Sequence, residues 1–211
     1  MIGPNLIMTA AHCVHQGRSD FARGLFKNII FQPSHPDHGT WYRVKQVFVL
    51  PAWISHGVYH ADVAILVTDG PMGIVDFWGV QTRLPVPSEY GWTTYGYPAR
   101  PPFDGQYPYT DGGPETNAPW SSGELKFEVK AIDNHDLTPG CSGGPWITNG
   151  RYAAGDFPIA GNDTQYGRPF HINGLNSFTF DNYPGIMVSP AFSRAVLDLV
   201  NTALTQISLQ V

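Results

Sequence analysis

The sequence is poor in cysteine and in charged residues, and it has no long hydrophobic run. Two cysteines among 211 residues, Cys13 and Cys141, are too few for a disulfide framework and show no CxxC metal spacing. Charged side chains make up 14% of the chain and the net charge is -5, which argues against a nucleic-acid partner, because such surfaces are basic. The best apolar run, VFVLPAWI, is short and contains Pro51, so we expect no membrane-spanning segment.

Metal and cofactor chemistry is not expected either. His35 with His38, and His56 with His60, stand close together in the sequence, but neither pair has an evident third ligand. The sequence therefore predicts no metal site and no cofactor.

Glycine and proline, in contrast, are abundant, with 23 and 19 residues. Together with short apolar or alternating runs closed by turn residues, they favour many short strands over helices. The paired prolines of LPVPSEYG, residues 84–91, favour extended backbone and predict a linker. We expect an all-β fold with two lobes, residues 1–84 and residues 85–211.

One helix is predicted, near the C-terminus, at about residues 190–204. Ser189 is a good N-cap, and Pro190 suits the first helical position, where its missing N–H costs nothing. Apolar side chains then recur at steps of three and four residues and form one stripe. They are Phe192, Ala195, Val196, Leu199, Val200 and Ala203.

Two polar side chains stand in apolar surroundings where each could take part in proton transfer. His12, in TAAHCV, follows a predicted strand, and its imidazole can accept a proton near neutral pH. Asp62, in HADVAILV, is costly in an apolar run unless it is paired. Each has a simpler interpretation, as a packed histidine and as a turn acceptor. Alternatively, Asp62 accepts the proton of one ring nitrogen of His12 and fixes its tautomer.

The third segment, TPGCSGGPW, is either a glycine-rich turn or a loop that presents a nucleophile. Its glycines permit backbone angles forbidden to other residues and leave the N–H groups of Gly140 and Ser142 uncovered. Two convergent N–H groups form the oxyanion hole that acyl transfer requires. The order His12, Asp62, Ser142 is the order of the chymotrypsin arrangement, which favours the nucleophile loop.

The segments TAAHC, DVAIL and GCSGGP resemble the His, Asp and Ser motifs of the trypsin/chymotrypsin-like serine peptidases. The patterns GWTTYGYP and INGLNSF are most similar to the bacterial glutamyl-endopeptidase-like branch. This resemblance implies a two-lobed chymotrypsin-like double β-barrel with the active site between the lobes. It implies Ser142 as nucleophile, His12 as base and Asp62 as the group that orients the base.

The same resemblance assigns further residues of the candidate site. Gly140 and Ser142 become the oxyanion donors, and Ser177 matches the serine that hydrogen-bonds the catalytic aspartate. Phe178 and Thr179 match the extended segment that pairs with the substrate backbone.

The chain also departs from the family. Cys141 stands where trypsin-type enzymes place an aspartate that receives the new N-terminus on activation, so we do not expect that mechanism. A Cys13–Cys141 disulfide is conceivable, but free thiols are favoured because nothing in the spacing enforces a close approach. Asp136 lies where trypsin keeps its pocket carboxylate, and Asn176 where glutamyl specificity places a histidine. The P1 preference stays open.

The two strands that open the family fold before the histidine strand are not found in this sequence. We therefore expect an incomplete first lobe with an exposed strand edge, and poor folding of these residues alone.

The leading hypothesis is a serine endopeptidase that forms an acyl-enzyme on Ser142, with a polypeptide substrate and no nucleic-acid or membrane partner. The alternatives are a non-catalytic binding module or inactive fragment of the same fold, and an esterase that uses the same site. By resemblance we expect a monomer that is secreted, although no secretory signal is visible after Met1.

Overall fold

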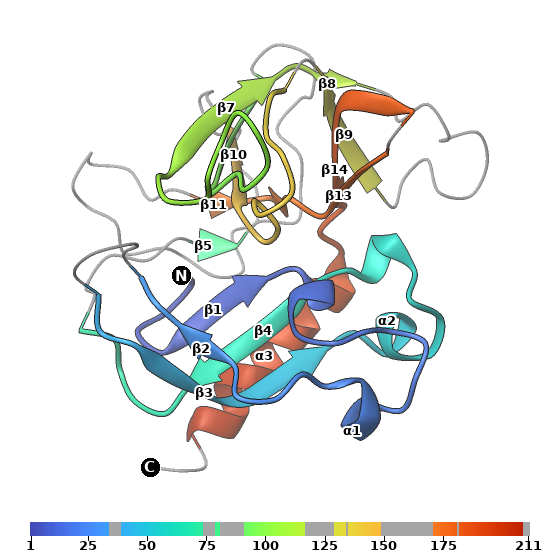
Figure 1. Ribbon diagram of the computed structural model, residues 1–211. Helices are drawn as coiled ribbons and strands as arrows, with labels where there is room; N and C mark the ends of the chain where they lie inside the picture. Colours follow the sequence, from blue (N-terminus) through green and yellow to red (C-terminus); the bar gives the residue numbers. More distant parts are fainter. Residues whose placement is uncertain are drawn as a thin grey trace.

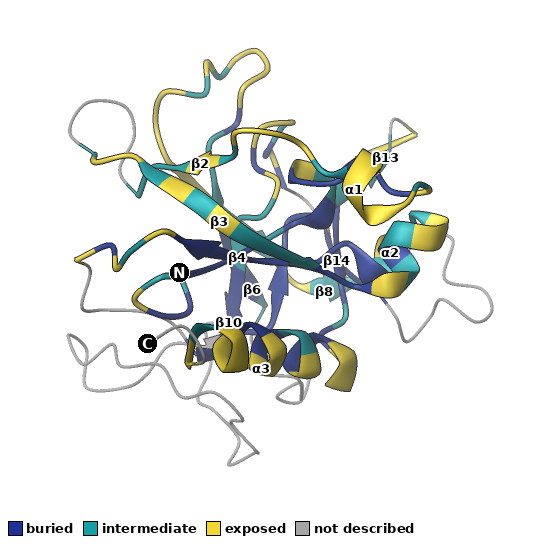
Figure 2. Cartoon of the chain, turned by 90° about the horizontal axis from the view of Figure 1, so that it is seen from below, coloured by how far each residue is buried: buried dark blue, intermediate teal, exposed yellow. Residues whose placement is uncertain are grey.

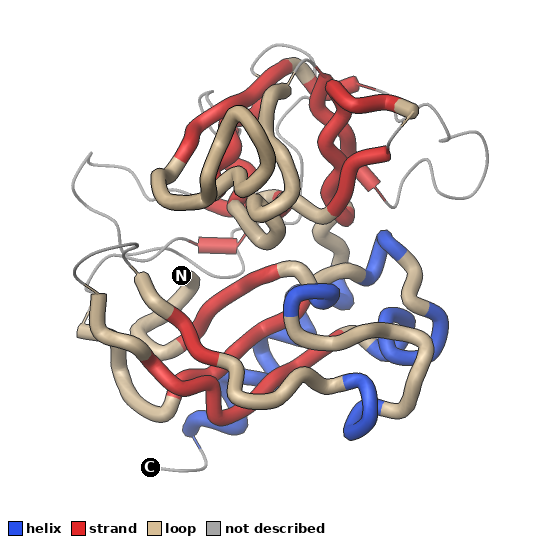
Figure 3. Tube along the Cα trace, in the orientation of Figure 1, coloured by secondary structure: helices blue, strands red, loops and turns tan. Residues whose placement is uncertain are grey.

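Antiparallel sheets make up most of the regular structure, in two groups of strands with one long helix (Figures 1 and 3). The computed structural model describes residues 1–33, 39–73, 79–80, 91–116, 129–133, 135–148, 171–180 and 182–208. The all-β fold with a C-terminal helix is confirmed. The predicted boundary between residues 84 and 85 lies outside the described residues and stays a prediction.

The first lobe is built around a four-stranded sheet in the order β1-β4-β3-β2. Its elements are β1 (Leu6–Thr9), η1 (Ala11–Cys13), α1 (Phe21–Gly24), β2 (Ile30–Phe31), β3 (Tyr42–Val49), α2 (Pro51–His56), η2 (Tyr59–Ala61) and β4 (Ala64–Thr68). Among the described residues β1 pairs only with β4, and β2 pairs only with β3, so these two strands form the edges of the sheet. Whether these residues fold poorly by themselves stays a prediction.

The second lobe contains two four-stranded sheets, in the orders β12-β10-β6-β7 and β13-β14-β9-β8. Its strands are β6 (Trp92–Gly96), β7 (Tyr109–Gly113), β8 (Glu115–Thr116), β9 (Val129–Asp133), β10 (Pro145–Thr148), β12 (Gly174–Leu175), β13 (Phe178–Phe180) and β14 (Tyr183–Pro190). A short parallel pair, β5 (Gly79–Val80) with β11 (His171–Ile172), joins segments that are far apart in sequence.

The C-terminal helix, α3 (Arg194–Ser208), begins later than predicted. Ser189 and Pro190 close strand β14, where they pair with residues of β9. The Ser189 hydroxyl accepts from Leu175 N–H and donates to Pro190 O, so it does not cap a helix. The predicted start at residue 190 was therefore wrong, because pairing with β9 outweighs a favourable capping sequence.

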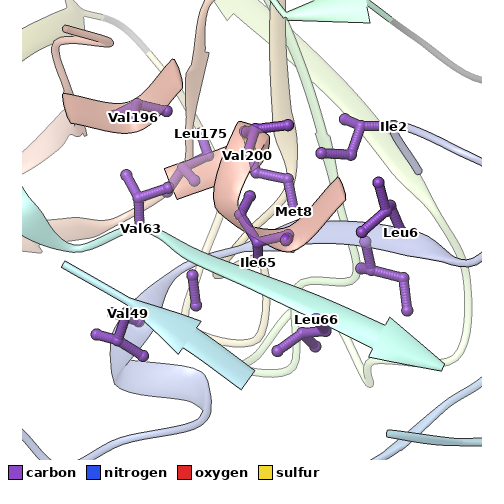
Figure 4. Packing of buried hydrophobic residues seen from close by; sticks show 14 of the residues in the cluster. Ile2, Leu6, Met8, Val49, Val63, Ile65, Leu66, Leu175, Val196 and Val200 are labelled. Atoms are coloured by element: carbon purple, nitrogen blue, oxygen red, sulfur yellow. The ribbon is translucent and has the colours of Figure 1, made fainter. Parts of the chain in front are cut away.

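Although α3 follows the second lobe in sequence, it packs on the sheet of the first lobe. Figure 1 shows the chain running from β14 down to α3, which lies beside β3 and β4. In Figure 4, Val196 and Val200 of α3 lie close to Val63 and Ile65. The opposite face of the helix is exposed (Figure 2).

Burial on both faces explains the composition of β4, whose residues Ala64 to Thr68 are all buried. A central strand that is covered on two sides needs a continuous apolar run and no polar alternation. Two short helices that the sequence analysis missed, α1 and α2, lie at the surface of the same lobe. No helix in the described part of the chain has the length and apolar character to cross a membrane.

Candidate active site

His12 lies in the helical turn η1, just after the edge strand β1 ends at Thr9. Ala10 and Ala11 are fully buried, and these small residues let the turn pack closely on the core. The side chain of His12 is 36% exposed, so its ring can be reached from solvent.

Asp62 follows η2 and is fully buried at the start of the run that leads into β4. Its Oδ1 accepts from the His12 backbone N–H at 2.8 Å, and its Oδ2 lies 2.7 Å from His12 Nδ1. Oδ2 also accepts from the Ser177 hydroxyl at 2.5 Å. A buried carboxylate is costly unless hydrogen bonds stabilise its charge, and these donors supply that stabilisation.

This pairing determines what the His12 ring can do. With Nδ1–H donating to Asp62, the neutral ring carries its lone pair on Nε2, which is the atom that can accept a proton. Burial lowers the pKa of His12, while the hydrogen bond and charge of Asp62, helped by the Cys13 side chain, raise it by more. The pKa of His12 therefore lies above its ordinary value of 6.5.

The loop that carries Ser142 needs glycine at two positions with positive φ, Gly140 at 111° and Gly143 at 81°. A Cβ on Gly143 would overlap the side chain of Thr9, so the loop lies directly against the end of β1. A Cβ on Gly140 would lie 2.8 Å from that of Ala99. The glycines thus place the loop between β1 of the first lobe and the segment after β6.

Ser142 is exposed at the tip of this loop. Its hydroxyl makes no hydrogen bond to His12 or to any other described residue. The backbone N–H groups of Gly140 and Ser142 likewise have no partner among the described residues. Gly143, next to Ser142, lies against Thr9 and Ala10, two to three residues before His12, and the two backbone donors are left available.

A cavity of about 490 Å³ lies next to Ser142, lined partly by Phe178, Thr179 and Phe180 of β13. Arg100 is the charged residue in its lining, and no carboxylate lines it among the described residues. Among the described strands β13 pairs only with β14, which places it at the edge of its sheet. An edge strand presents backbone groups to which an extended peptide can pair.

Of the predicted substrate-binding residues, Asn176 belongs to the cavity lining and Asp136 does not. Asp136 is exposed and is not part of the cavity lining, and its backbone N–H donates to Asp111. Asn176 adjoins the cavity, but it is 1% exposed and its side-chain amide hydrogen-bonds to protein groups. Its register in the sequence therefore predicted a substrate contact that its side chain is not free to make.

Both cysteines are free thiols, with Cys13 exposed and Cys141 buried, so the alternative disulfide is absent. Cys141 packs against Gly96, and burial raises its pKa to about 11. A thiol with such a pKa is protonated at neutral pH and is a poor nucleophile. Within the described ranges, no three His, Cys, Asp or Glu side chains gather so as to hold a metal ion.

The sequence analysis missed the groups that support the loop from behind. Ala99 N–H donates to Pro139 O at 2.8 Å, and Gly143 N–H donates to Asn176 O at 2.8 Å. These contacts join segments that are far apart in sequence, and no local pattern marks them.

Comparisons with known proteins agree with this fold. Residues 1–177 match the Trypsin family. The chain is similar in structure to the thermostable serine protease AL20 from an extremophilic microorganism, with 25% identity and a TM-score of 0.73 over 96% of this chain and 85% of that one. No curated protein matches the chain in sequence.

Two further solved structures share the fold. Protease Anisep from Arthrobacter nicotinovorans is 24% identical, with a TM-score of 0.73 over 95% of this chain and 83% of that one. A Glu endopeptidase in complex with MPD is 19% identical, with a TM-score of 0.69 over 96% of this chain and 82% of that one. The fold is thus that of the chymotrypsin-like serine proteases. The chain belongs to the trypsin family.

Proposed function

We propose that the protein is a serine endopeptidase in which Ser142, His12 and Asp62 act as the catalytic triad. The observation that carries the proposal is the hydrogen-bonded His12–Asp62 pair, whose carboxylate is buried, beside a loop with an exposed serine. The N–H groups of Gly140 and Ser142 in this loop have no partner among the described residues. Membership of the trypsin family supports it.

In the proposed reaction, Ser142 Oγ attacks the peptide carbonyl carbon while His12 Nε2 takes the hydroxyl proton. Asp62 stabilises the imidazolium that results. His12 then gives the proton to the leaving amine as the C–N bond breaks, and an acyl-enzyme remains. Water then attacks the ester carbonyl carbon and passes a proton to His12. The bond between this carbon and Ser142 Oγ breaks as His12 returns the proton to Ser142, and the peptide leaves with a new carboxyl group.

The developing negative charge on the carbonyl oxygen is stabilised by the N–H groups of Gly140 and Ser142. Preorganised donors of this kind contribute about 10²- to 10³-fold to the rate. The edge strand β13, with Phe178 and Thr179, holds the substrate backbone, and the adjoining cavity takes a side chain.

We extend the proposal to a polypeptide substrate, a monomer that acts outside the cell, and two lobes that divide between residues 84 and 85. Support for the substrate and the location comes from family membership alone.

The test is labelling with a fluorophosphonate probe, which reacts with an activated serine. We expect the native chain to be labelled, Ser142→Ala and His12→Ala to stay unlabelled, and Cys141→Ala to keep its labelling. Cleavage of peptide amides separates a peptidase from an esterase, which hydrolyses esters only. A folded native chain without labelling would show a non-catalytic binding module or an inactive fragment instead.

A further inference from the structure

The side-chain amide of Asn176 contacts the loop that carries Ser142 from its buried side. We infer that Asn176 is a positioning residue that orients the peptide between Cys141 and Ser142, and thereby holds the Ser142 N–H as an oxyanion donor. This inference rests on the proposed function and assigns a role to a residue that does not touch the reacting atoms.

The side-chain amide of Asn176 makes four hydrogen bonds, two through each of its polar atoms. Its Oδ1 accepts from Thr94 Oγ1 and from Trp146 Nε1, each at 2.7 Å. Its Nδ2 donates to the carbonyl oxygens of Tyr95 at 3.0 Å and Cys141 at 3.2 Å. Because an indole N–H can only donate, Trp146 determines which end of the amide is oxygen.

The bond to Cys141 O sets the direction of the Ser142 N–H. Carbonyl and N–H point in opposite directions in a trans peptide. Cys141 O is held by Asn176 Nδ2 at 3.2 Å and by Gly144 N–H at 3.0 Å. The Ser142 N–H of the same peptide therefore points away from Asn176, where it meets no described partner.

The other proposed oxyanion donor is held by the same principle. Pro139 O accepts from Ala99 N–H at 2.8 Å, so the Gly140 N–H of that peptide points the opposite way. Both peptides are thus restrained through their carbonyl groups, one by backbone and the other by the Asn176 side chain.

Main-chain hydrogen bonds also join Asn176 to the loop. Gly143 N–H donates to Asn176 O, and Asn176 N–H donates to Gly144 O, each at 2.8 Å. A Cβ on Gly144 would lie 2.7 Å from Asn176 Nδ2, so the loop fits against the amide only with glycine there. Asn176 is itself 1% exposed, which keeps its orientation rigid.

The test uses Asn176→Asp in the full chain. Aspartate keeps the shape and the acceptor for Thr94 and Trp146, but it places an oxygen against the carbonyls of Tyr95 and Cys141. We expect kcat for a peptide amide to fall about 10²-fold or more with KM nearly unchanged, as for loss of an oxyanion donor. Amide hydrogen exchange at Gly143 and Gly144, whose N–H groups are hydrogen-bonded in the native loop, should become at least about tenfold faster.

Thr94→Val is the matched control, because it removes one hydrogen bond to the same amide but leaves the donors to the loop. We expect it to lower stability while kcat stays within about threefold of native. Asn176→Ser tests the same loss without a buried charge. If both Asn176 variants are unfolded by circular dichroism, Asn176 is a folding residue and the inference is overturned.

The other outcomes are also decisive. A raised KM with unchanged kcat would show that Asn176 contacts the substrate and would overturn the inference. Equal losses of kcat in the Asn176 and Thr94 variants would also overturn it, because they would show that Asn176 acts only through the stability of the fold. Unchanged exchange at Gly143 and Gly144 overturns the positioning role whatever the activity. If the native chain does not react with a fluorophosphonate, the proposed function fails, and hydrogen exchange alone decides whether Asn176 holds the loop.

Discussion

The hydroxyl of Ser177 donates a hydrogen bond of 2.5 Å to Asp62, across 115 positions of the chain. Ser177 precedes β13 of the second lobe, whereas Asp62 precedes β4 of the first. The carboxylate that orients His12 is thus held from both lobes. A change in the relative position of the lobes should therefore alter the orientation of the His12 ring through Ser177 and Asp62.

Ser177→Ala should lower both stability and activity. Hydrogen bonds to charged groups contribute about 1.5 to 3 kcal/mol, so the free energy of unfolding should fall by about that amount. Without this donor the Asp62 charge acts more strongly on His12, and the acid limb of the kcat/KM profile should move to higher pH. Denaturant unfolding and pH–rate profiles test this.

Ser189→Ala is the control for Ser177→Ala. Its hydroxyl is also buried and hydrogen-bonded, but to backbone groups. It should lose stability without moving the pH profile, and a shift as large as that of Ser177→Ala would contradict the coupling to Asp62.

Activity should appear as pH rises through the pKa of His12, because only the neutral ring can accept the proton of Ser142. That pKa is raised above its ordinary value of 6.5 by Asp62. Asp62→Asn removes the carboxylate, so the pKa should fall and kcat should drop about 10⁴-fold. NMR titration of His12 in the Ser142→Ala background measures the pKa directly. An unchanged pKa in Asp62→Asn would show that another group raises it.

Asp136→Asn should leave the cleavage preference unchanged. The side chain is exposed and stands outside the cavity beside Ser142, so no charge is removed from the substrate pocket. Rates for peptides with Arg, Glu, Phe or Ala before the cleaved bond should keep their ratios within about twofold. A selective loss of cleavage after Arg would show that Asp136 reaches the substrate after all.

Val200→Ala should weaken the docking of α3 on the first lobe. Val200 is fully buried in the core that α3 shares with β4, and removing its two methyl groups should cost about 2 kcal/mol of unfolding free energy. Leu204→Ala, on the same helix but 39% exposed, should change stability by about 0.5 kcal/mol or less. Equal losses in chemical denaturation would argue against this packing.

Local sequence patterns predicted the backbone conformation around the candidate site residues better than they predicted the contacts of these residues with distant segments. The glycines around Ser142 and the apolar run after Asp62 each mark a local conformation, and the structure places them as a loop and a buried strand. The short helix α2 also had a local signal that was overlooked, with Pro51 at its first turn and a left-handed Gly57 after its end.

The predictions that failed depended on partners far away in the chain. The capping signal at Ser189 was real but weaker than pairing with β9, and sequence position alone put α3 with the second lobe. Asp136 was placed by register with a family, and it lies outside the cavity lining. Register says where a residue lies along the chain but not which neighbours its side chain contacts, as the hydrogen bonds of the Asn176 amide show.

By itself, then, the sequence determined the chemical groups and the backbone freedom of the site: His12, Asp62, Ser142 and the glycines with positive φ. These depend on side-chain type and on steric limits within a few residues. Only the tertiary structure decided that α3 covers the first sheet and that the Asn176 amide hydrogen-bonds to the serine loop. Such contacts join segments that meet only when the whole chain packs, so no local pattern records them.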